Sequence, residues 1–220
     1  MVKLNNDMSE FHQIENTVYK GAPMKEAKRA MIFVHGRGDS SDKMQLLAEE
    51  IVDDPEMALI FPMATKGTWY PKGFMADWEE NQPWLDSALA YIDQLVQEIK
   101  QAGIKEEDIY FLGFSQGACL TIEYATRNAQ QYGGIMVLSG GLIGPTLVKA
   151  HYKGDFKHTP ILIGCSDIDH HIPLNRLEES KVVLEQMNAI LDYQIYPGMD
   201  HLINDDEKER VKVIIAADEF

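Results

Sequence analysis

Residues 109–117 read Ile-Tyr-Phe-Leu-Gly-Phe-Ser-Gln-Gly. The first six form an apolar run with the length of a buried strand, and a stretch compatible with a helix follows from Gln116 to about Gln131. Between them lies the pattern Gly-x-Ser-x-Gly, which is typical of a sharp strand-to-helix turn with an exposed serine hydroxyl. The two glycines leave room for the strand and the helix to approach each other closely. This stretch therefore predicts a strand, a turn with Ser115 at its tip, and a helix whose first N–H groups face the serine.

The rest of the chain alternates between short apolar runs and longer amphipathic stretches. Strands are predicted at residues 30–35, 57–61, 109–114, 134–138, 160–164 and 193–196. Helices are predicted at residues 40–53, 84–102, 116–131, 173–190 and 205–217. This alternation predicts an α/β fold with a mainly parallel central sheet and helices on both of its faces. In such sheets, ligands bind at the loops that follow the carboxyl ends of the strands.

The composition is that of an ordinary globular protein. The 220 residues are 45% hydrophobic and 25% charged, and no repeat or linker divides them, so we expect a single domain over residues 1–220. Acidic residues number 35 against 20 basic ones, for a formal net charge of −15. This surplus argues against a nucleic-acid partner and against stable association with an anionic membrane surface.

Nothing in the sequence predicts export or membrane insertion. No apolar run is long enough to span a bilayer, and residues 1–10 are polar, without the apolar core of a signal peptide. The two cysteines, Cys119 and Cys165, are too few for a disulfide framework and do not form a metal-type pair. Cys119 lies one turn into the helix after Ser115 and is interpreted as a small core residue rather than a reactive thiol. We therefore expect a cytoplasmic protein.

The loop after the first predicted strand, His35-Gly36-Arg37-Gly38-Asp39, is rich in glycine. A loop in this place can point the Arg37 backbone N–H toward Ser115, where the Gln116 N–H would join it. Two such donors stabilise the negative oxygen of a tetrahedral intermediate in acyl transfer. The sequence therefore predicts an oxyanion hole formed by the backbone N–H groups of Arg37 and Gln116. His35 ends the strand and is interpreted as a structural hydrogen-bonding residue.

A serine nucleophile needs a base, and the base needs an orienting carboxylate. Of the seven histidines, His201 alone combines a loop directly after a predicted strand with a helix that follows. Asp167 and Asp169 both follow the strand predicted at 160–164, and their positions by themselves leave either one as the acid. The order serine, aspartate, histidine along the chain is that of α/β-hydrolases.

The same acidic loop allows a second interpretation. Asp167, Asp169, His170 and His171 are residue types that bind metal ions. Adjacent residues rarely all point inward, however, and no distant group of ligands completes a coordination shell. We therefore expect neither a metal nor another cofactor.

Two predicted connections are longer than usual, at residues 63–83 and 139–159. The first carries several aromatic residues, which argues for an ordered segment. Trp69, Tyr70 and Trp78 are interpreted as substrate-binding residues in a pocket wall, with burial in the core as the alternative. Too few residues remain outside the predicted core for a separate lid domain.

Three ordered signatures run along the chain. They are His35-Gly36-x-Gly38-Asp39, Gly113-Phe114-Ser115-Gln116-Gly117, and Asp169-x-x-Ile172-Pro173 with Gly198-Met199-x-His201. Together they resemble the carboxylesterase/phospholipase family of compact α/β-hydrolases, which includes the acyl-protein thioesterases, over nearly the whole chain from Ala30 onward. The family's acid stands four places before the proline, so the resemblance implies Asp169 rather than Asp167. It also implies His201 as the general base and the Arg37 and Gln116 N–H groups as oxyanion donors.

The chain departs from part of this family at Arg37. Family thioesterases that act on lipidated proteins usually carry an apolar residue there. The stretch from Thr68 to Trp84 instead resembles a bacterial branch of predicted esterases. A cation and an aromatic wall at the mouth of the site argue against a long acyl chain.

The sequence therefore predicts a serine carboxylesterase. Its triad would be Ser115, Asp169 and His201, its intermediate an acyl-enzyme, and its substrate a small-molecule ester with a short acyl group. An acyl thioesterase or a lysophospholipase would use the same triad, because the oxyanion hole and the base serve all of these substrates. A non-catalytic binding module on the same scaffold is the alternative from a different class.

Overall fold

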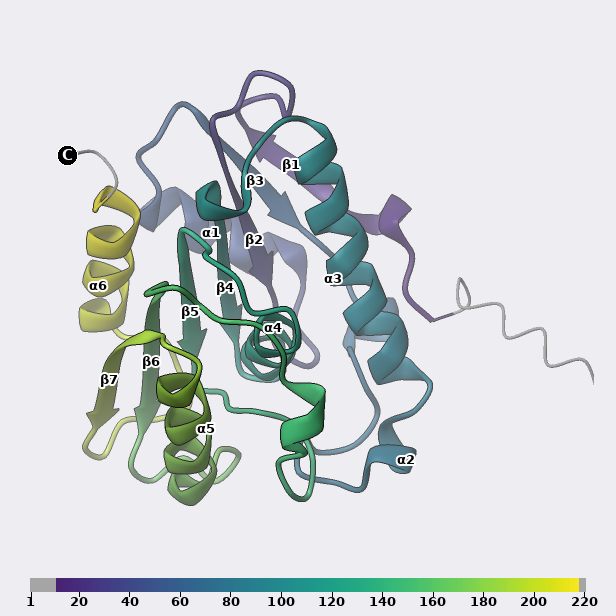
Figure 1. Ribbon diagram of the computed structural model, residues 1–220, viewed down its shortest axis with the longest axis vertical. Coiled ribbons are helices and arrows are strands. Elements are labelled where there is room, and N and C mark those ends of the chain that lie inside the picture. Colours follow the sequence, from purple (N-terminus) through teal and green to yellow (C-terminus); the bar gives the residue numbers. More distant parts are fainter. Residues whose placement is uncertain (1–10, 218–220) are drawn as a thin grey trace, which may run out of the picture.

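The computed structural model describes residues 11–217 and is built around a seven-stranded sheet with the order β1-β3-β2-β4-β5-β6-β7 (Figure 1). The strands are β1 (Val18–Gly21), β2 (Arg29–Val34), β3 (Met57–Phe61), β4 (Ile109–Phe114), β5 (Gly134–Leu138), β6 (Pro160–Ser166) and β7 (Ile190–Tyr196). The edge strand β1 pairs with β3 in antiparallel fashion, whereas the other five pairings are parallel. The predicted mainly parallel sheet is confirmed.

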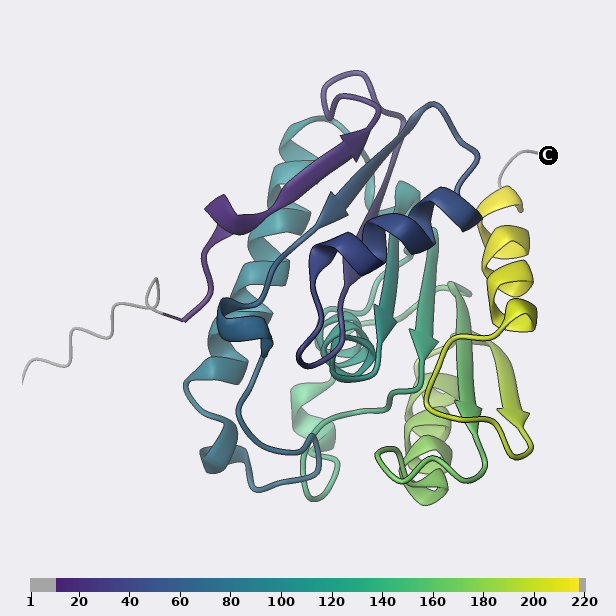
Figure 2. The same cartoon turned by 180° about the vertical axis from the view of Figure 1, so that it is seen from behind.

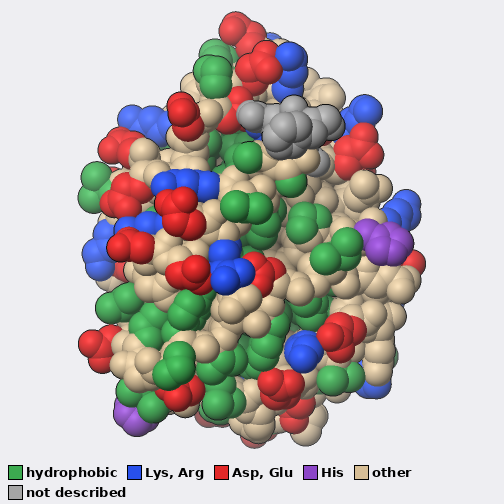
Figure 3. Space-filling model, turned by 90° about the vertical axis from the view of Figure 1, so that its left-hand side faces the viewer, with side chains coloured by type: hydrophobic (Ala, Val, Ile, Leu, Met, Phe, Trp, Pro, Cys, Tyr) green, Lys and Arg blue, Asp and Glu red, His purple; other side chains and the backbone are tan. Residues whose placement is uncertain are grey.

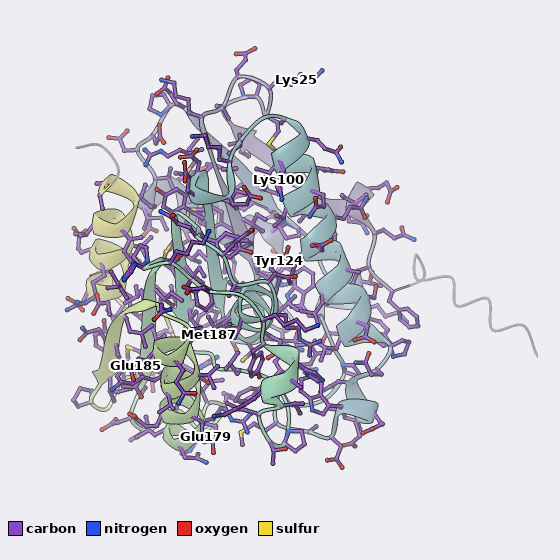
Figure 4. All side chains as sticks on the ribbon, viewed as in Figure 1. Lys25, Lys100, Tyr124, Glu179, Glu185 and Met187 are labelled. Atoms are coloured by element: carbon purple, nitrogen blue, oxygen red, sulfur yellow. The ribbon has the colours of Figure 1, made fainter. Side chains whose placement is uncertain are left out.

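Helices cover both faces of this sheet. They are α1 (Ser41–Ile51), the short α2 (Trp78–Asn81), α3 (Trp84–Gln101), α4 (Gln116–Arg127), α5 (Leu174–Gln186) and α6 (Asp205–Ala216). Helices α3, α4 and α5 lie on the face toward the viewer in Figure 1, and α1 and α6 lie on the opposite face, seen from the front in Figure 2. In Figure 4 the labelled Tyr124 side chain belongs to α4, and its hydroxyl donates a hydrogen bond to Asp93 on α3 at 3.0 Å.

The central strands are apolar throughout because both of their faces are covered. In β2, Ala30, Ile32 and Val34 pack into the core beneath α3 and α4, whereas Met31 and Phe33 pack into the core beneath α1 and α6. Successive side chains of a strand point to opposite faces, so a strand buried on both sides reads as a continuous apolar run. This is why the sequence alone located the central strands.

The structure corrects several predicted boundaries. Helix α4 ends at Arg127 rather than Gln131, because Ala129 pairs with Gly154 in an isolated bridge. Helix α5 ends at Gln186 rather than Ile190, because Asn188 takes a φ of 60° and the chain turns into β7. Strand β1 was not predicted at all. Its residues are partly or fully exposed at the sheet edge, so they do not form an apolar run.

The loops that carry the candidate site gather at one edge of the sheet. Strands β4 to β7 all point toward the lower edge in Figure 1. The loops after β4, β6 and β7 hold Ser115, Asp169 and His201 in that order, and the long connection at 139–159 follows β5. Parallel pairing therefore brings together residues that lie up to 86 positions apart.

The described surface carries interspersed charges. Figure 3 looks onto the side of the molecule with α6 and β7, where acidic and basic side chains lie next to one another. Arg210 on α6, for example, pairs with Asp206 at 2.6 Å and with Asp192 on β7 at 2.9 Å. Among residues 11–217, no helix is long and apolar enough to cross a membrane. The expectation that the chain lacks a signal peptide concerns residues 1–10, which lie outside the described residues.

Candidate active site

Ser115 stands at the tip of a strained turn between β4 and α4. Its φ of 54° and ψ of −120° are unusual for a residue other than glycine, and such strain is typical of functional positions. The turn depends on its flanking glycines. A Cβ atom at Gly113 would lie 2.5 Å from the Gly117 carbonyl oxygen, and one at Gly117 would lie 2.1 Å from the Val34 carbonyl oxygen. Only glycine allows β2, β4 and α4 to approach this closely, as the sequence predicted.

A chain of two hydrogen bonds joins Ser115 to His201 and His201 to Asp169. The His201 Nε2 atom lies 2.8 Å from the Ser115 Oγ atom, and the Nδ1 atom lies 2.7 Å from the Asp169 Oδ2 atom. A carboxylate can only accept, so Nδ1 carries the proton and Nε2 accepts from the serine hydroxyl. The structure therefore brings the three predicted residues together in the arrangement of a nucleophile, a base and an orienting acid.

The Asp169 carboxylate is held in its ionised form. Its side chain is fully buried, and its second oxygen accepts backbone N–H bonds from His171 at 2.8 Å and Ile172 at 3.3 Å. Burial by itself raises the pKa of this carboxyl, but the hydrogen bonds from His201 and from the His171 backbone outweigh it and lower the pKa below its ordinary value. The site therefore offers His201 a negative partner.

The Asp167 carboxylate does not contact His201. Its Oδ1 atom accepts the Gly198 N–H at 2.7 Å, which ties the loop after β6 to the loop after β7. The carboxylate in contact with His201 is that of Asp169, whereas the Asp167 side chain is exposed and accepts from the backbone of the neighbouring loop. Of the two histidines in the same loop, His170 is exposed and His171 stands with its ring centre 5.0 Å from that of His201. Within residues 11–217, no group of three or more His, Cys, Asp or Glu side chains could hold a metal ion.

The predicted oxyanion donors flank the serine. Gln116 is the first residue of α4, and a Cβ atom at Gly36 would lie 3.4 Å from the Ser115 Cβ atom, so the loop that carries Arg37 passes directly beside the turn. The first N–H groups of a helix have no partner within the helix. Among the described hydrogen bonds, neither the Arg37 nor the Gln116 backbone N–H donates to a protein acceptor. Both are therefore available to a ligand.

His35 fixes the loop beside the serine. Its Nε2 atom accepts the Ala64 N–H at 3.0 Å, so its Nδ1–H donates to the Gly36 carbonyl at 2.7 Å. The side chain is fully buried, and burial lowers its pKa below the ordinary value, which keeps the imidazole neutral. The interpretation of His35 as a structural hydrogen-bonding residue agrees with this geometry.

The side chains of Gln116 and Arg37 hold the neighbouring loop, a role that the sequence did not reveal. The Gln116 Oε1 atom accepts from the Trp69 N–H at 3.0 Å, and its Nε2 atom donates to the Tyr70 carbonyl at 2.7 Å. The exposed Arg37 guanidinium donates to the Pro71 carbonyl at 2.9 Å and to the Lys72 carbonyl. These contacts join loop positions that no local pattern connects.

A cavity of about 280 Å³ opens beside Ser115. It is lined by Arg37, Tyr70, Gly73, Phe74, Ser115, Gln116, Cys119, His171, Ile172 and His201. Of the three aromatic residues interpreted as substrate-binding, Tyr70 lines this cavity and the two tryptophans do not. Phe74, Ile172 and Cys119 are wall residues that sequence reasoning did not assign to the site.

Trp69 and Trp78 fill the interior of the long loops instead. Trp69 is fully buried, and its Nε1–H donates to the His35 carbonyl at 2.8 Å. Trp78 packs against Arg127, whose guanidinium carbon lies 5.3 Å from the ring centre, and against the ring of His151. Neither tryptophan lines the described cavity, so this geometry favours the alternative interpretation, in which they pack the long loop onto the body of the protein.

Comparison with known proteins gives the same fold and family. The model of the phospholipase/carboxylesterase family matches residues 17–217. The acyl-protein thioesterase 1 of Saccharomyces cerevisiae is 29% identical over 214 residues, covering 88% of this chain and 94% of the yeast protein. That of Kluyveromyces lactis is 30% identical over 205 residues, covering 84% of this chain and 90% of its own.

Solved structures show the same similarity. A phospholipase/carboxylesterase from Dyadobacter fermentans is 46% identical, with a TM-score of 0.89 over 93% of this chain and 97% of that chain. The Arabidopsis thaliana protein SOBER1 is 20% identical, and its TM-score of 0.75 over 88% of this chain shows the shared fold. The predicted α/β-hydrolase fold and the resemblance in sequence are confirmed. The chain belongs to the phospholipase/carboxylesterase family of α/β-hydrolases.

Proposed function

We propose that this protein is a serine carboxylic-ester hydrolase that forms an acyl-enzyme intermediate on Ser115. The observation that carries the proposal is the chain of two hydrogen bonds, of 2.8 and 2.7 Å, from Ser115 through His201 to Asp169. The serine and the histidine both line the same cavity, so a bound ester would meet the nucleophile and the base together.

The first half of the reaction transfers the acyl group to the serine. The Ser115 Oγ atom attacks the ester carbon while His201 Nε2 accepts its proton, and the Asp169 carboxylate stabilises the imidazolium that results. The carbonyl oxygen becomes an oxyanion, which accepts hydrogen bonds from the Arg37 and Gln116 backbone N–H groups. The C–O bond to the alcohol then breaks, and the proton on Nε2 passes to the leaving alcohol.

The second half of the reaction releases the acid. Water takes the place of the alcohol, and His201 Nε2 accepts one of its protons as its oxygen attacks the acyl carbon. The same two backbone donors stabilise the second oxyanion. When this intermediate collapses, the bond to Ser115 breaks, the serine regains its proton from His201, and the carboxylic acid leaves.

The size of the cavity supports a small-molecule ester with a short acyl group. Its volume of about 280 Å³ lies just below the range of about 300–1,000 Å³ that is usual for ligand pockets. Phe74 and Ile172 provide apolar contact, and Arg37 adds a cation to the lining, which is unfavourable to a long apolar chain. The short-acyl substrate therefore remains our proposal.

A thioester is the second candidate substrate. The two yeast relatives are named acyl-protein thioesterases, and the triad geometry accepts a thiol leaving group as well as an alcohol. Direct competition between an oxygen ester and a sulfur ester with the same acyl group separates the two. Each kcat/KM is divided by the rate constant for hydrolysis of the same ester by hydroxide. If the corrected value is higher for the thioester, a thioesterase function replaces our first proposal.

The decisive experiment measures kcat/KM on p-nitrophenyl esters from acetate to palmitate, with S115A as the blank. We expect a maximum at two to four acyl carbons and, for S115A, loss of nearly all turnover without a change in Tm. A maximum at eight carbons or more would mean an acyl channel that extends beyond the described cavity. Rates equal to those of S115A throughout, together with no labelling of Ser115 by a fluorophosphonate, would favour a binding module without activity.

A further inference from the structure

The hydroxyl of Tyr70 is a buried polar group without a strong hydrogen-bond partner. Tyr70 is 1% exposed, and its hydroxyl oxygen is one of five buried side-chain oxygen or nitrogen atoms in the described residues that lack a hydrogen bond. The other buried tyrosines differ in this respect. For example, the Tyr124 hydroxyl donates to Asp93 at 3.0 Å, and the Tyr132 hydroxyl donates to the Asn128 carbonyl at 2.8 Å.

The side chain that carries this hydroxyl lines the catalytic cavity. The phenol has the Cys119 thiol as its hydrogen-bond neighbour and interacts electrostatically with the Arg37 guanidinium, and both of these residues line the cavity as well. Burial raises the pKa of the Tyr70 hydroxyl well above its ordinary value, so it keeps its proton. Burial likewise raises the pKa of the Cys119 thiol to about 12, and a neutral thiol is only a weak acceptor. The wall thus contains a hydrogen-bond donor whose strong acceptor is missing.

The backbone of Tyr70 is held in place at this point. Its carbonyl accepts the Gln116 Nε2–H at 2.7 Å and the Thr68 hydroxyl at 2.8 Å. Its neighbour Trp69 is bonded through both its N–H and its indole nitrogen. The ring is therefore anchored from a fixed backbone, and its hydroxyl stays beside the cavity. A buried polar group without a partner costs free energy, which a ligand recovers when it supplies the partner.

We propose that Tyr70 selects acyl groups that carry an acceptor oxygen on the chain beyond the scissile carbonyl, as in the esters of short alkoxy or oxo acids. The inference rests on the proposed esterase function and names its substrate class. Phe74 and Ile172 supply apolar contact in this wall, and the hydroxyl is an uncharged donor that fixes how the acyl group lies. A site with such a donor rejects the analogue that lacks the matching acceptor, because the donor then stays unpaired.

The test uses pairs of p-nitrophenyl esters that differ in one atom. Methoxyacetate replaces one methylene of butanoate by oxygen, and 3-methoxypropanoate does the same for pentanoate one carbon further out. For each pair, the ratio of kcat/KM between the oxygen ester and the all-carbon ester is measured in the wild type and in Y70F. Intrinsic reactivity cancels in the comparison of the two proteins. We expect Y70F to lower this ratio about tenfold for at least one pair. A change of less than twofold for both pairs overturns the inference.

Two controls separate the possible causes. Y132F removes a buried hydroxyl that bonds within the protein and lies outside the cavity, so it should leave both ratios unchanged and lower Tm. Y70F should keep or raise Tm, because the hydroxyl that it removes has at most the weak Cys119 thiol as a partner in the free protein. A fall in Tm as large as that of Y132F would reveal a strong internal partner and overturn the inference. Rates of all esters equal to those of S115A would reject the esterase proposal itself, whereas hydrolysis without a Y70F effect would reject the selection by Tyr70 alone.

Discussion

The amide of Gln116 holds the cavity wall through three hydrogen bonds, and we predict that Q116A lowers the free energy of unfolding by about 2–6 kcal/mol. The largest part comes from the buried Trp69 N–H, which loses its acceptor at a cost of about 1–3 kcal/mol. The bonds to the Tyr70 carbonyl and the Thr68 hydroxyl contribute about 0.5–1.5 kcal/mol each. The Thr68 hydroxyl still donates to the Tyr70 carbonyl at 2.8 Å in Q116A, so neither group is left without a partner.

The same substitution distinguishes the role of the Gln116 side chain from the role of its backbone N–H. The backbone N–H that we propose as an oxyanion donor is retained in Q116A, as are Ser115, Asp169 and His201. The loop that carries Tyr70 is no longer tied to the start of α4, and a displacement of about 1 Å at such a site costs up to about 10²-fold in rate. We expect kcat/KM on a short p-nitrophenyl ester to fall about 10- to 100-fold.

The assay is urea unfolding followed by circular dichroism, together with kcat/KM, on Q116A and two further variants. Q116E places a carboxylate oxygen opposite the Tyr70 carbonyl, where the wild type has a donor at 2.7 Å, and should destabilise at least as much as Q116A at pH 7.5. Q101A changes an exposed residue at the end of α3 and should stay within about 0.5 kcal/mol of the wild type. If the free energy of unfolding falls by less than about 1 kcal/mol in Q116A, or if Q116E is as stable as the wild type, the Gln116 side chain does not hold the loop that carries Trp69 and Tyr70.

Two further predictions concern Asp169, the acid of the proposed triad, and the buried histidines. D169N should lower kcat about 10⁴-fold, because His201 loses the partner that sets its tautomer. D167N should lower kcat less than about tenfold, since the Asp167 carboxylate bonds the Gly198 N–H rather than His201. A larger loss in D167N would reverse the assignment. Burial lowers the pKa of both His12 and His35, and each accepts a backbone N–H of the loop after β3, at 3.2 Å from Thr65 and 3.0 Å from Ala64. The unfolded chain takes up these protons below about pH 6.5 while the folded chain resists them, so stability should fall as the pH drops from 6.5 through the lowered values. Urea unfolding between pH 7.5 and 5 tests this, and H12Q should show a smaller fall; an equal fall would contradict the role of His12.

The central sheet could be predicted because its signals are local. A strand that is buried on both faces consists of consecutive apolar residues, and β2 to β5 were found within one residue of their ends. The edge of the sheet lacks this signal. Strand β1 is partly or fully exposed, and β7 is partly buried at best, so the first was missed and the second was predicted three residues too short.

The order of the candidate site residues could also be predicted. The turn at Ser115 is a local event that its flanking glycines specify, and His201 stands out by its place between a strand and a helix. Parallel pairing then brings the ends of β4, β6 and β7 to one edge of the sheet, whatever the loops contain.

Side-chain direction within the loops was decided by the tertiary structure alone. Asp167 and Asp169 are two residues apart in the same loop, yet one bonds the Gly198 N–H and the other bonds His201. Trp69 and Tyr70 are adjacent, yet one is enclosed in the core and the other lines the cavity.

The physical reason is the range of the interactions. Helices and strands repeat, so the direction of each side chain follows from its position and the sequence alone determines which face it joins. An irregular loop has no period, and its side chains point where distant partners hold them. For the wall of this cavity those partners are Gln116 and Arg37, which lie dozens of residues from the loop that they hold, so only the folded chain determined which residues meet Ser115.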